Sequence, residues 1–217
     1  MNNLSYFTKT KLLWVILSLS LLSACATKTP DNLIPIQVNH VSQTQAWEMQ
    51  GKLAVKTPNN KFSTNLYWLH TPDSNELKLT TMLGTTVLSL TTQHGIARLE
   101  VDGKIYEHHD AQELLTEITG WSIPVDSLPL WITGQTDIDD NIISQDQQLR
   151  PQVLLSSSDT PWRVEFKSWQ QQSGAQLPRL LQLTKDQLRL KIQISQWQAL
   201  AATTTQQSNI NDKTINE

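Results

Sequence analysis

The chain has 217 residues, of which 38% are hydrophobic and 17% are charged, and its formal net charge is −3. This length and composition predict one folded domain with a single core, flanked by non-globular ends. Lys and Arg are scattered along the sequence, so it shows no electrostatic footprint for nucleic acid or for a strongly anionic membrane surface. The single cysteine, Cys25, excludes an internal disulfide and a zinc site built from several cysteines.

The amino-terminal segment has the layout of a secretory signal. Two lysines precede an apolar run that ends at Leu22, and two small residues then lead into Cys25. The run is too short to be a stable membrane span. We therefore predict a signal peptide over residues 1–24 and a mature chain that starts at Cys25. Its net charge is −5, because cleavage removes two lysines and no acidic residue.

The segment Leu22-Ser23-Ala24-Cys25 resembles the lipobox of bacterial lipoproteins, in which the cysteine is acylated and the signal is cut before it. The alternative is a plain signal with an unrelated cysteine. The resemblance implies a covalent lipid on Cys25 and no other cofactor. Ala26, where Asp favours inner-membrane retention, implies the outer membrane by the same analogy. The polar stretch 25–45 contains two prolines and is predicted to be an acylated tether.

Alternating apolar and polar residues predict a folded domain over residues 46–200. About six strands are expected before the chain reaches His108, and turns such as Pro58-Asn59-Asn60 and Asp102-Gly103 join them. Connections this short make neighbouring strands antiparallel.

One hairpin, Glu76 to Leu90, has an unusual tip that carries Met82, Leu83 and Gly84. Hairpin tips usually carry Asn, Asp, Gly or Pro, which tolerate turn dihedrals and keep the tip polar. Two interpretations remain open at this point. Met82 and Leu83 either fold back onto the sheet as core residues, or they form a tip that enters an apolar environment.

The period of the pattern then changes from strand to helix. Asp110 and Glu113 have capping-box spacing, which predicts a helix that Gly120 ends. A second short helix is expected from Ser127 to near Gly134. Apolar residues of the two helices include Leu114, Leu115, Ile118 and Trp131.

Strand alternation returns in four segments, the last from Leu188 to Trp197, and residues 201–217 are predicted to be a disordered tail. Ten or so antiparallel strands with a helical insertion predict a mainly β (α+β) fold, a barrel or half barrel whose mouth the helices cover. The inside of such a shell is filled by its own side chains or by a ligand. Tryptophans such as Trp47 and Trp68 suit either use.

Catalysis and metal binding have one candidate, the cluster His108-His109-Asp110. Adjacent side chains on an extended strand point apart, which disfavours a metal site. The Gly-x-Ser-x-Gly pattern of a lipase is absent. We therefore predict no catalytic residue, no metal and no enzyme activity.

From about Trp47 to Trp197 the chain resembles the LolB family of outer-membrane lipoprotein receptors. The likeness rests on the lipobox, the hairpin ELKLTTMLGTTVLSL, the helix DAQELLTEITG and the segment from Ile123-Pro124 to Thr133-Gly134. It implies an unclosed antiparallel β-barrel with an α-helical lid over a hydrophobic cavity. Candidate residues of the cavity and lid are Trp47, Leu66, Trp68, Leu114, Ile118 and Trp131.

The resemblance also implies partners and a site of action. The receptor would accept lipidated cargo proteins from a periplasmic carrier like LolA and release their acyl chains into the lipid of the inner leaflet of the outer membrane. The receptor would be a lipid-anchored monomer that faces the periplasm. The family's membrane-entering tip falls on Leu83-Gly84, while Thr81-Met82 replaces its common Asn-Pro. The alternative is a lipocalin-like lipoprotein that stores a small apolar ligand and needs no apolar tip.

Overall fold

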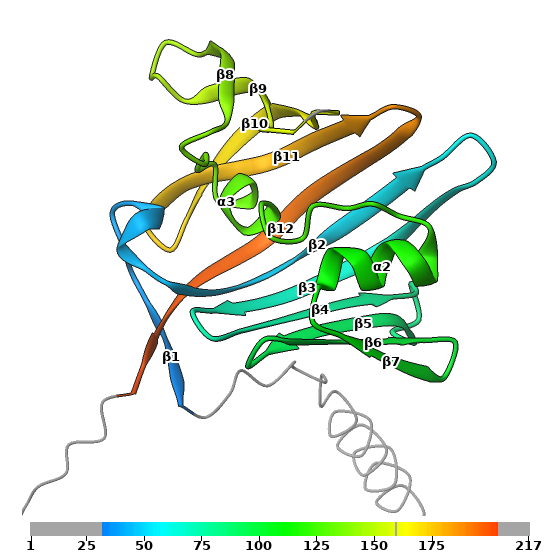
Figure 1. Ribbon diagram of the computed structural model, residues 1–217. Coiled ribbons are helices and arrows are strands. Elements are labelled where there is room, and N and C mark those ends of the chain that lie inside the picture. The colour runs from blue at the N-terminus through cyan, green and yellow to red at the C-terminus, as the bar shows by residue number, and fades with distance from the viewer. Residues whose placement is uncertain (1–31, 159, 204–217) are drawn as a thin grey trace, which may run out of the picture. The chain divides into compact units, whose positions relative to one another are not determined.

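The computed structural model describes residues 32–158 and 160–203, which belong to one compact unit (Figure 1). The predicted signal, Cys25 and nearly all of the predicted tail lie outside the described residues. Within the described part, no helix has the length and apolar character needed to cross a membrane.

The described residues form twelve strands, two α-helices and a 3-10 helix. The strands are β1 Leu33–Ile36, β2 Ala46–Lys56, β3 Lys61–Thr71, β4 Ser74–Thr80, β5 Thr86–Gln93, β6 Ile96–Val101, β7 Lys104–His108, β8 Asn141–Gln145, β9 Pro151–Leu155, β10 Arg163–Gln172, β11 Ala175–Lys185 and β12 Leu188–Ala202. The helices are η1 Val41–Gln43, α2 Ala111–Thr119 and α3 Leu128–Ile132.

All strand pairs are antiparallel, and they form one sheet in the order β7-β6-β5-β4-β3-β2-β12-β11-β10-β9-β8, with β1 added to β12. The terminal strands β7 and β8 do not pair with each other, so the curled sheet stays open. The predicted fold, an unclosed antiparallel sheet with a helical cover, is confirmed.

The long strand β12 shows why the sheet has one apolar face. Leu190, Ile192 and Ile194 are buried, while the alternating Arg189 and Lys191 are exposed, because successive side chains of a strand point to opposite faces. A register shift between Ile194 and Gln196 then brings the next buried residues back to the inner face.

The inner face is covered by the segment from α2 to α3, which we call the lid (residues 111–134; Figure 1). Helix α2 begins where predicted, because the Asp110 carboxylate accepts a hydrogen bond from the Glu113 N–H at 2.8 Å. It ends at Gly120, whose φ of 74° lies in the left-handed region that favours glycine. The lid leaves the edge strand β7 and leads to the opposite edge strand β8.

The folded part extends further than the sequence predicted at both ends. Residues up to 45 were expected to form a tether, but β1 pairs with the end of β12, and Val38 and Val41 are buried in the core. The physical reason is that β12 continues to Ala202, and its free edge pairs with β1. The short apolar stretch around Ile34 gives no sign in the sequence that it pairs with a strand so far along the chain. Strand β8 was also missed, because it is a short exposed edge strand without clear alternation.

A glycine in β2 provides a test of this packing. A methyl group on Gly51 would lie 2.1 Å from the carbonyl oxygen of Gln193 in β12. We expect Gly51→Ala to lower the free energy of unfolding by about 3 kcal/mol, measured by urea denaturation. Lys52→Ala, the control at the next position, should stay within about 0.5 kcal/mol of the parent. Equal stability of the two variants would contradict the close strand approach.

Candidate functional site

The hairpin between β4 and β5 ends in an apolar turn that stands clear of the molecule. Leu83 is 95% exposed and Met82 is 81% exposed. They are the central residues of a turn in which the Gly84 N–H donates to the carbonyl of Thr81 at 3.0 Å. The structure excludes the interpretation in which these side chains fold back as core.

The turn is held by its own hydrogen bonds. The Thr81 N–H donates to the carbonyl of Thr85 at 2.8 Å, and the Thr85 N–H donates to Thr81 Oγ1 at 3.2 Å. Gly84 has a φ of 85°, as in the common three-residue hairpin loop that ends in a left-handed residue. Thr81 and Gly84 therefore define the shape of the tip without a proline at position 82.

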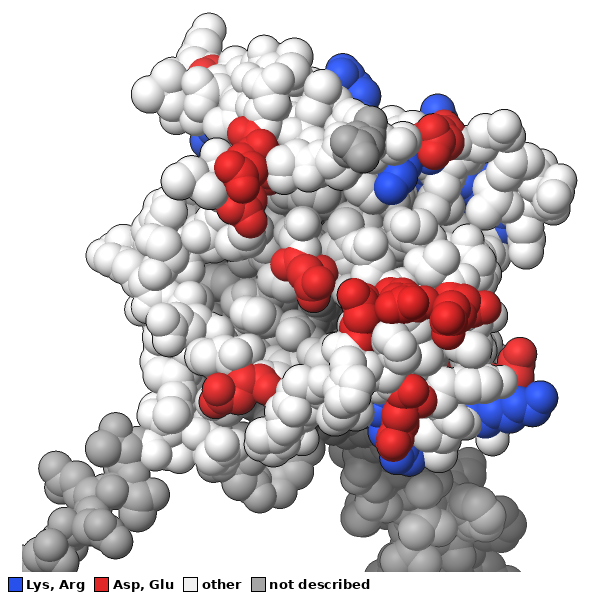
Figure 2. All heavy atoms as spheres, in the orientation of Figure 1, with Lys and Arg blue, Asp and Glu red and all other residues white. Residues whose placement is uncertain are grey.

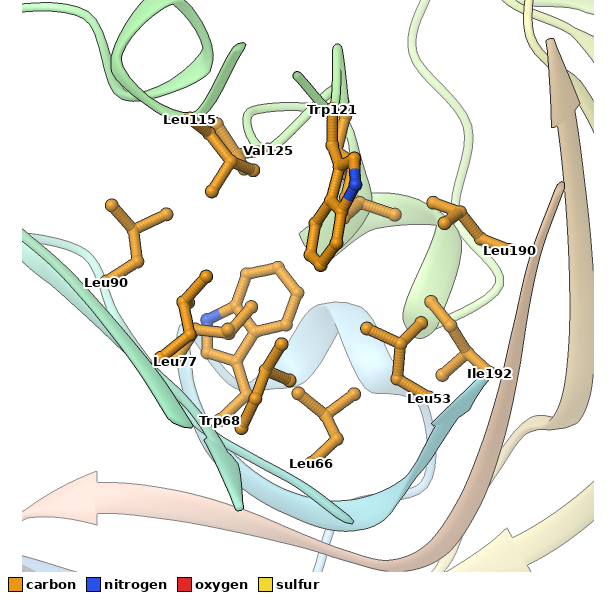
Figure 3. A pocket seen from close by; sticks show the side chains of 14 residues that line it. Leu53, Leu66, Trp68, Leu77, Leu90, Leu115, Trp121, Val125, Leu190 and Ile192 are labelled. Atoms are coloured by element: carbon orange, nitrogen blue, oxygen red, sulfur yellow. The ribbon is translucent and has the colours of Figure 1, made fainter. Parts of the chain in front are cut away.

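An apolar cavity lies between the sheet and the lid (Figure 3). Every residue that lines it is apolar. The strands β2, β3, β4, β5 and β12 contribute Leu53, Leu66, Trp68, Leu77, Leu79, Leu88, Leu90, Leu190 and Ile192. The lid contributes Leu115, Trp121, Ile123, Val125 and Leu128. Figure 3 shows Trp121 reaching from the lid towards the strand side chains around Trp68.

The cavity is small in this closed form, with a volume of about 40 Å³. Pockets that enclose a drug-sized ligand have volumes of about 300–1,000 Å³. A ligand of that size does not fit in the cavity as the structure shows it.

The lid contacts the sheet mainly through apolar side chains, with one long polar contact of 3.9 Å between His108 Nε2 of β7 and Glu113 Oε2 of α2. The ring of Trp121 stacks on Phe62 of β3, with centroids 5.1 Å apart and planes inclined by 24°. Among the described residues, no hydrogen bond joins the lid to a strand: its hydrogen bonds stay within the segment or reach its flanks, as between Trp131 Nε1–H and Asp140. Lifting the lid thus breaks no lid-to-strand hydrogen bond.

A network of polar groups lies beside the cavity. The Trp68 Nε1–H donates to Asn75 Oδ1 at 3.1 Å, and His70 Nδ1–H donates to the same oxygen at 2.7 Å. The His70 ring stacks on Trp47 with centroids 5.0 Å apart. Burial lowers the pKa of His70, and the hydrogen bond to Asn75 opposes this effect only in part.

The six predicted cavity and lid residues occupy different places. Leu66 and Trp68 line the cavity. Trp47 contacts Trp68 edge-on, with ring centroids 5.6 Å apart, and is not part of the lining. Leu114, Ile118 and Trp131 pack in the core around the lid, outside the lining.

Sequence reasoning missed most of the lining residues. Four of them, Leu77, Leu79, Leu88 and Leu90, belong to the tip hairpin, and their alternation was the available signal. Trp121 and Val125 lie on the irregular connection between the helices, where periodicity gives no information about direction.

His108 ends β7, and His109 lies in the short connection to α2. The His108 ring accepts a hydrogen bond from the Asp110 N–H at 3.1 Å, and the rings of His108 and His109 are tilted by 55° with centroids 6.5 Å apart. Within the described residues, no group of three His, Cys, Asp or Glu side chains is placed to hold a metal.

Comparison with known proteins gives a family match over most of this domain. Residues 45–197 match the family model described as outer membrane lipoprotein LolB. Similar relatives are the outer-membrane lipoprotein LolB of Shewanella woodyi, 80% identical over 96% of this chain and 99% of the relative, and that of Shewanella sediminis, 65% identical over the full length of both. A solved LolA superfamily protein from Nitrosomonas europaea has a TM-score of 0.47 at 8% identity, covering 72% of this chain and 86% of that one.

The half-buried His70 makes stability depend on pH. Its pKa in the folded state is lowered, so below about pH 6.5 the unfolded state binds a proton that the folded state resists. The free energy of unfolding should therefore fall as the pH is lowered from about 7 to about 5. His70→Gln should reduce this slope in urea denaturation, whereas His109→Gln, at an exposed position, should keep it. A slope unchanged in His70→Gln would show that His70 is not its source.

Proposed function

The chain belongs to the LolB family of outer-membrane lipoproteins, and from this premise we propose that it accepts lipidated proteins from a LolA-like periplasmic carrier and inserts their acyl chains into the inner leaflet of the outer membrane. It is a lipoprotein-localisation factor and not an enzyme. We also propose Cys25 as the site of its own lipid.

The observation that carries the proposal is the apolar cavity under a lid without hydrogen bonds to the strands. An acyl chain that moves from the carrier's cavity to this one, and then to a bilayer, avoids exposure to water at each step. Only differences in affinity between the sites are needed, so no catalytic group takes part. The small volume of the closed cavity supports a transient occupant that opens it.

The exposed tip supports the second half of the proposal. A single buried leucine contributes about 1.5–3 kcal/mol, which is small beside a lipid anchor with two or more acyl chains. Leu83 is therefore not the main membrane anchor of the acylated protein. Its role is to disturb the leaflet at the point where the cargo is delivered.

A lipocalin-like store is the alternative, and the exposed tip weighs against it. A store has no use for a turn that exposes Met82 and Leu83.

The tip is tested by Leu83→Glu. A charge at the tip cannot enter the bilayer without a large desolvation cost. Transfer of a lipidated cargo protein from LolA to the variant should be retained, while delivery from the variant to vesicles should fall to background. Ile138→Glu is the matched control, since Ile138 is 94% exposed and lies outside the tip. Unimpaired delivery by Leu83→Glu would refute the proposed tip mechanism.

The lid is tested by Phe62→Ala, which removes the stack on Trp121. An aromatic pair of this kind contributes about 0.5–1.5 kcal/mol. Uptake of a fluorescent fatty acid, followed by stopped-flow fluorescence, should therefore become about two- to tenfold faster. Phe166→Ala removes a similar stack, on Trp169, away from the cavity lining and should leave the uptake rate unchanged. Equal rates in parent and Phe62→Ala would mean that this contact does not restrain the lid.

A further inference from the structure

The outer face of three neighbouring strands gathers five exposed cations, Lys52, Lys56, Lys61, Arg189 and Lys191, which we call the basic face. Lys61 of β3 lies opposite Lys56 of β2, which in turn lies opposite Arg189 of β12. Their side chains point outward, because the alternating residues Leu53, Leu190 and Ile192 line the cavity. Cations that are scattered in the sequence are thus brought together by the sheet.

Within the part of the chain that the structure describes, no acidic side chain pairs with the basic face. Glu165 of β10 is already paired with Arg163 and Lys167. Like charges directly opposite each other destabilise a sheet. A net charge of −3 for the whole chain rules out a generally basic composition as the cause.

Acidic residues are concentrated on the lid side of the molecule. Residues 105–149, which include the lid, contain nine Asp and Glu and no Lys or Arg. Figure 2, seen from the lid side, shows acidic side chains across this face and basic ones only near its margins. Such a separation of charge orients a protein in front of an anionic surface, with the lid turned away from it.

The basic face and the apolar tip lie at the same end of the sheet. Thr80, the last residue before the tip, is opposite Asn65 of β3, and Asn65 is opposite Lys52 of β2. Exposed apolar side chains beside a group of cations are the combination that binds bilayers with anionic headgroups.

We propose that the basic face docks on the phosphate-bearing headgroups of an anionic bilayer and holds Met82 and Leu83 at its surface. This inference rests on the proposed function, in which the tip enters a membrane. Each cation near an anionic surface raises the affinity about fivefold. Two cations removed together should therefore lower binding about 25-fold.

The test uses the mature chain from residue 25 with Cys25→Ala, which removes acylation and keeps the whole folded unit. Its binding is measured by flotation with vesicles of phosphatidylethanolamine, with and without phosphatidylglycerol. The parent should bind the phosphatidylglycerol vesicles more tightly, and added salt should weaken this preference. Equal binding to both vesicle types would overturn the proposal.

The decisive variant is Lys56→Gln with Arg189→Gln, which should lose the preference for phosphatidylglycerol. Lys78→Gln with Arg98→Gln is the matched control, since it removes the same charge from residues that pair with Glu76 and Glu107 outside the basic face. Circular dichroism confirms that both variants are folded. A preference retained by Lys56→Gln with Arg189→Gln, or lost equally in the control, would overturn the proposal.

Two further experiments test whether the basic face binds a soluble phosphate compound instead of a bilayer, and whether the tip contributes to binding. Inorganic phosphate should displace the parent from vesicles no better than sodium chloride of equal ionic strength. Stronger displacement would assign the basic face to a soluble phosphate compound and overturn the bilayer as its partner. Leu83→Glu should weaken binding to both vesicle types but keep the preference for phosphatidylglycerol. If Leu83→Glu binds as tightly as the parent, the proposed contact of the tip with the bilayer is wrong. The basic face remains supported in that case, provided that Lys56→Gln with Arg189→Gln has lost the preference for phosphatidylglycerol.

Discussion

The structure depends on one constraint, the need to cover the apolar inner face of a sheet that does not close. The chain covers it with its own lid, and the cover consists of side chains such as Trp121 and Leu128 rather than hydrogen bonds to the strands. Apolar contact is non-directional, so the same surface that stabilises the closed form can accept another apolar body. The residues that stabilise the closed arrangement are thus the same ones that line the cavity of the proposed function.

The tip keeps two apolar side chains, those of Met82 and Leu83, exposed to water. A free loop would bury them, but the hydrogen bonds around Thr81 and the left-handed conformation of Gly84 hold the turn outward. In the proposed docking, the basic face would attract an anionic surface at long range, and the tip would act only on contact.

Much of this could be predicted from the sequence, for identifiable reasons. Strand alternation and the cap at Asp110 are local signals, so the sheet and α2 were found. The exposure of Leu83 could not be decided from the residues alone, because a burial pattern does not say which face a turn presents. Trp131 was expected near the cavity but is core, since an indole suits either place. The basic face depends on pairings such as Lys56 with Arg189, residues 133 positions apart in the chain, and no local pattern contains them.

The route of the lid along the fold has a mechanical consequence. One continuous segment leaves the rim at β7 and rejoins the molecule at β8, the two strands that bound the gap in the sheet. It spans the opening of the curled sheet. An outward movement of the lid would therefore act on both rims of the sheet, because the chain is continuous with them. No pairing between β7 and β8 closes the gap, so backbone hydrogen bonds between these two rims do not oppose such a movement.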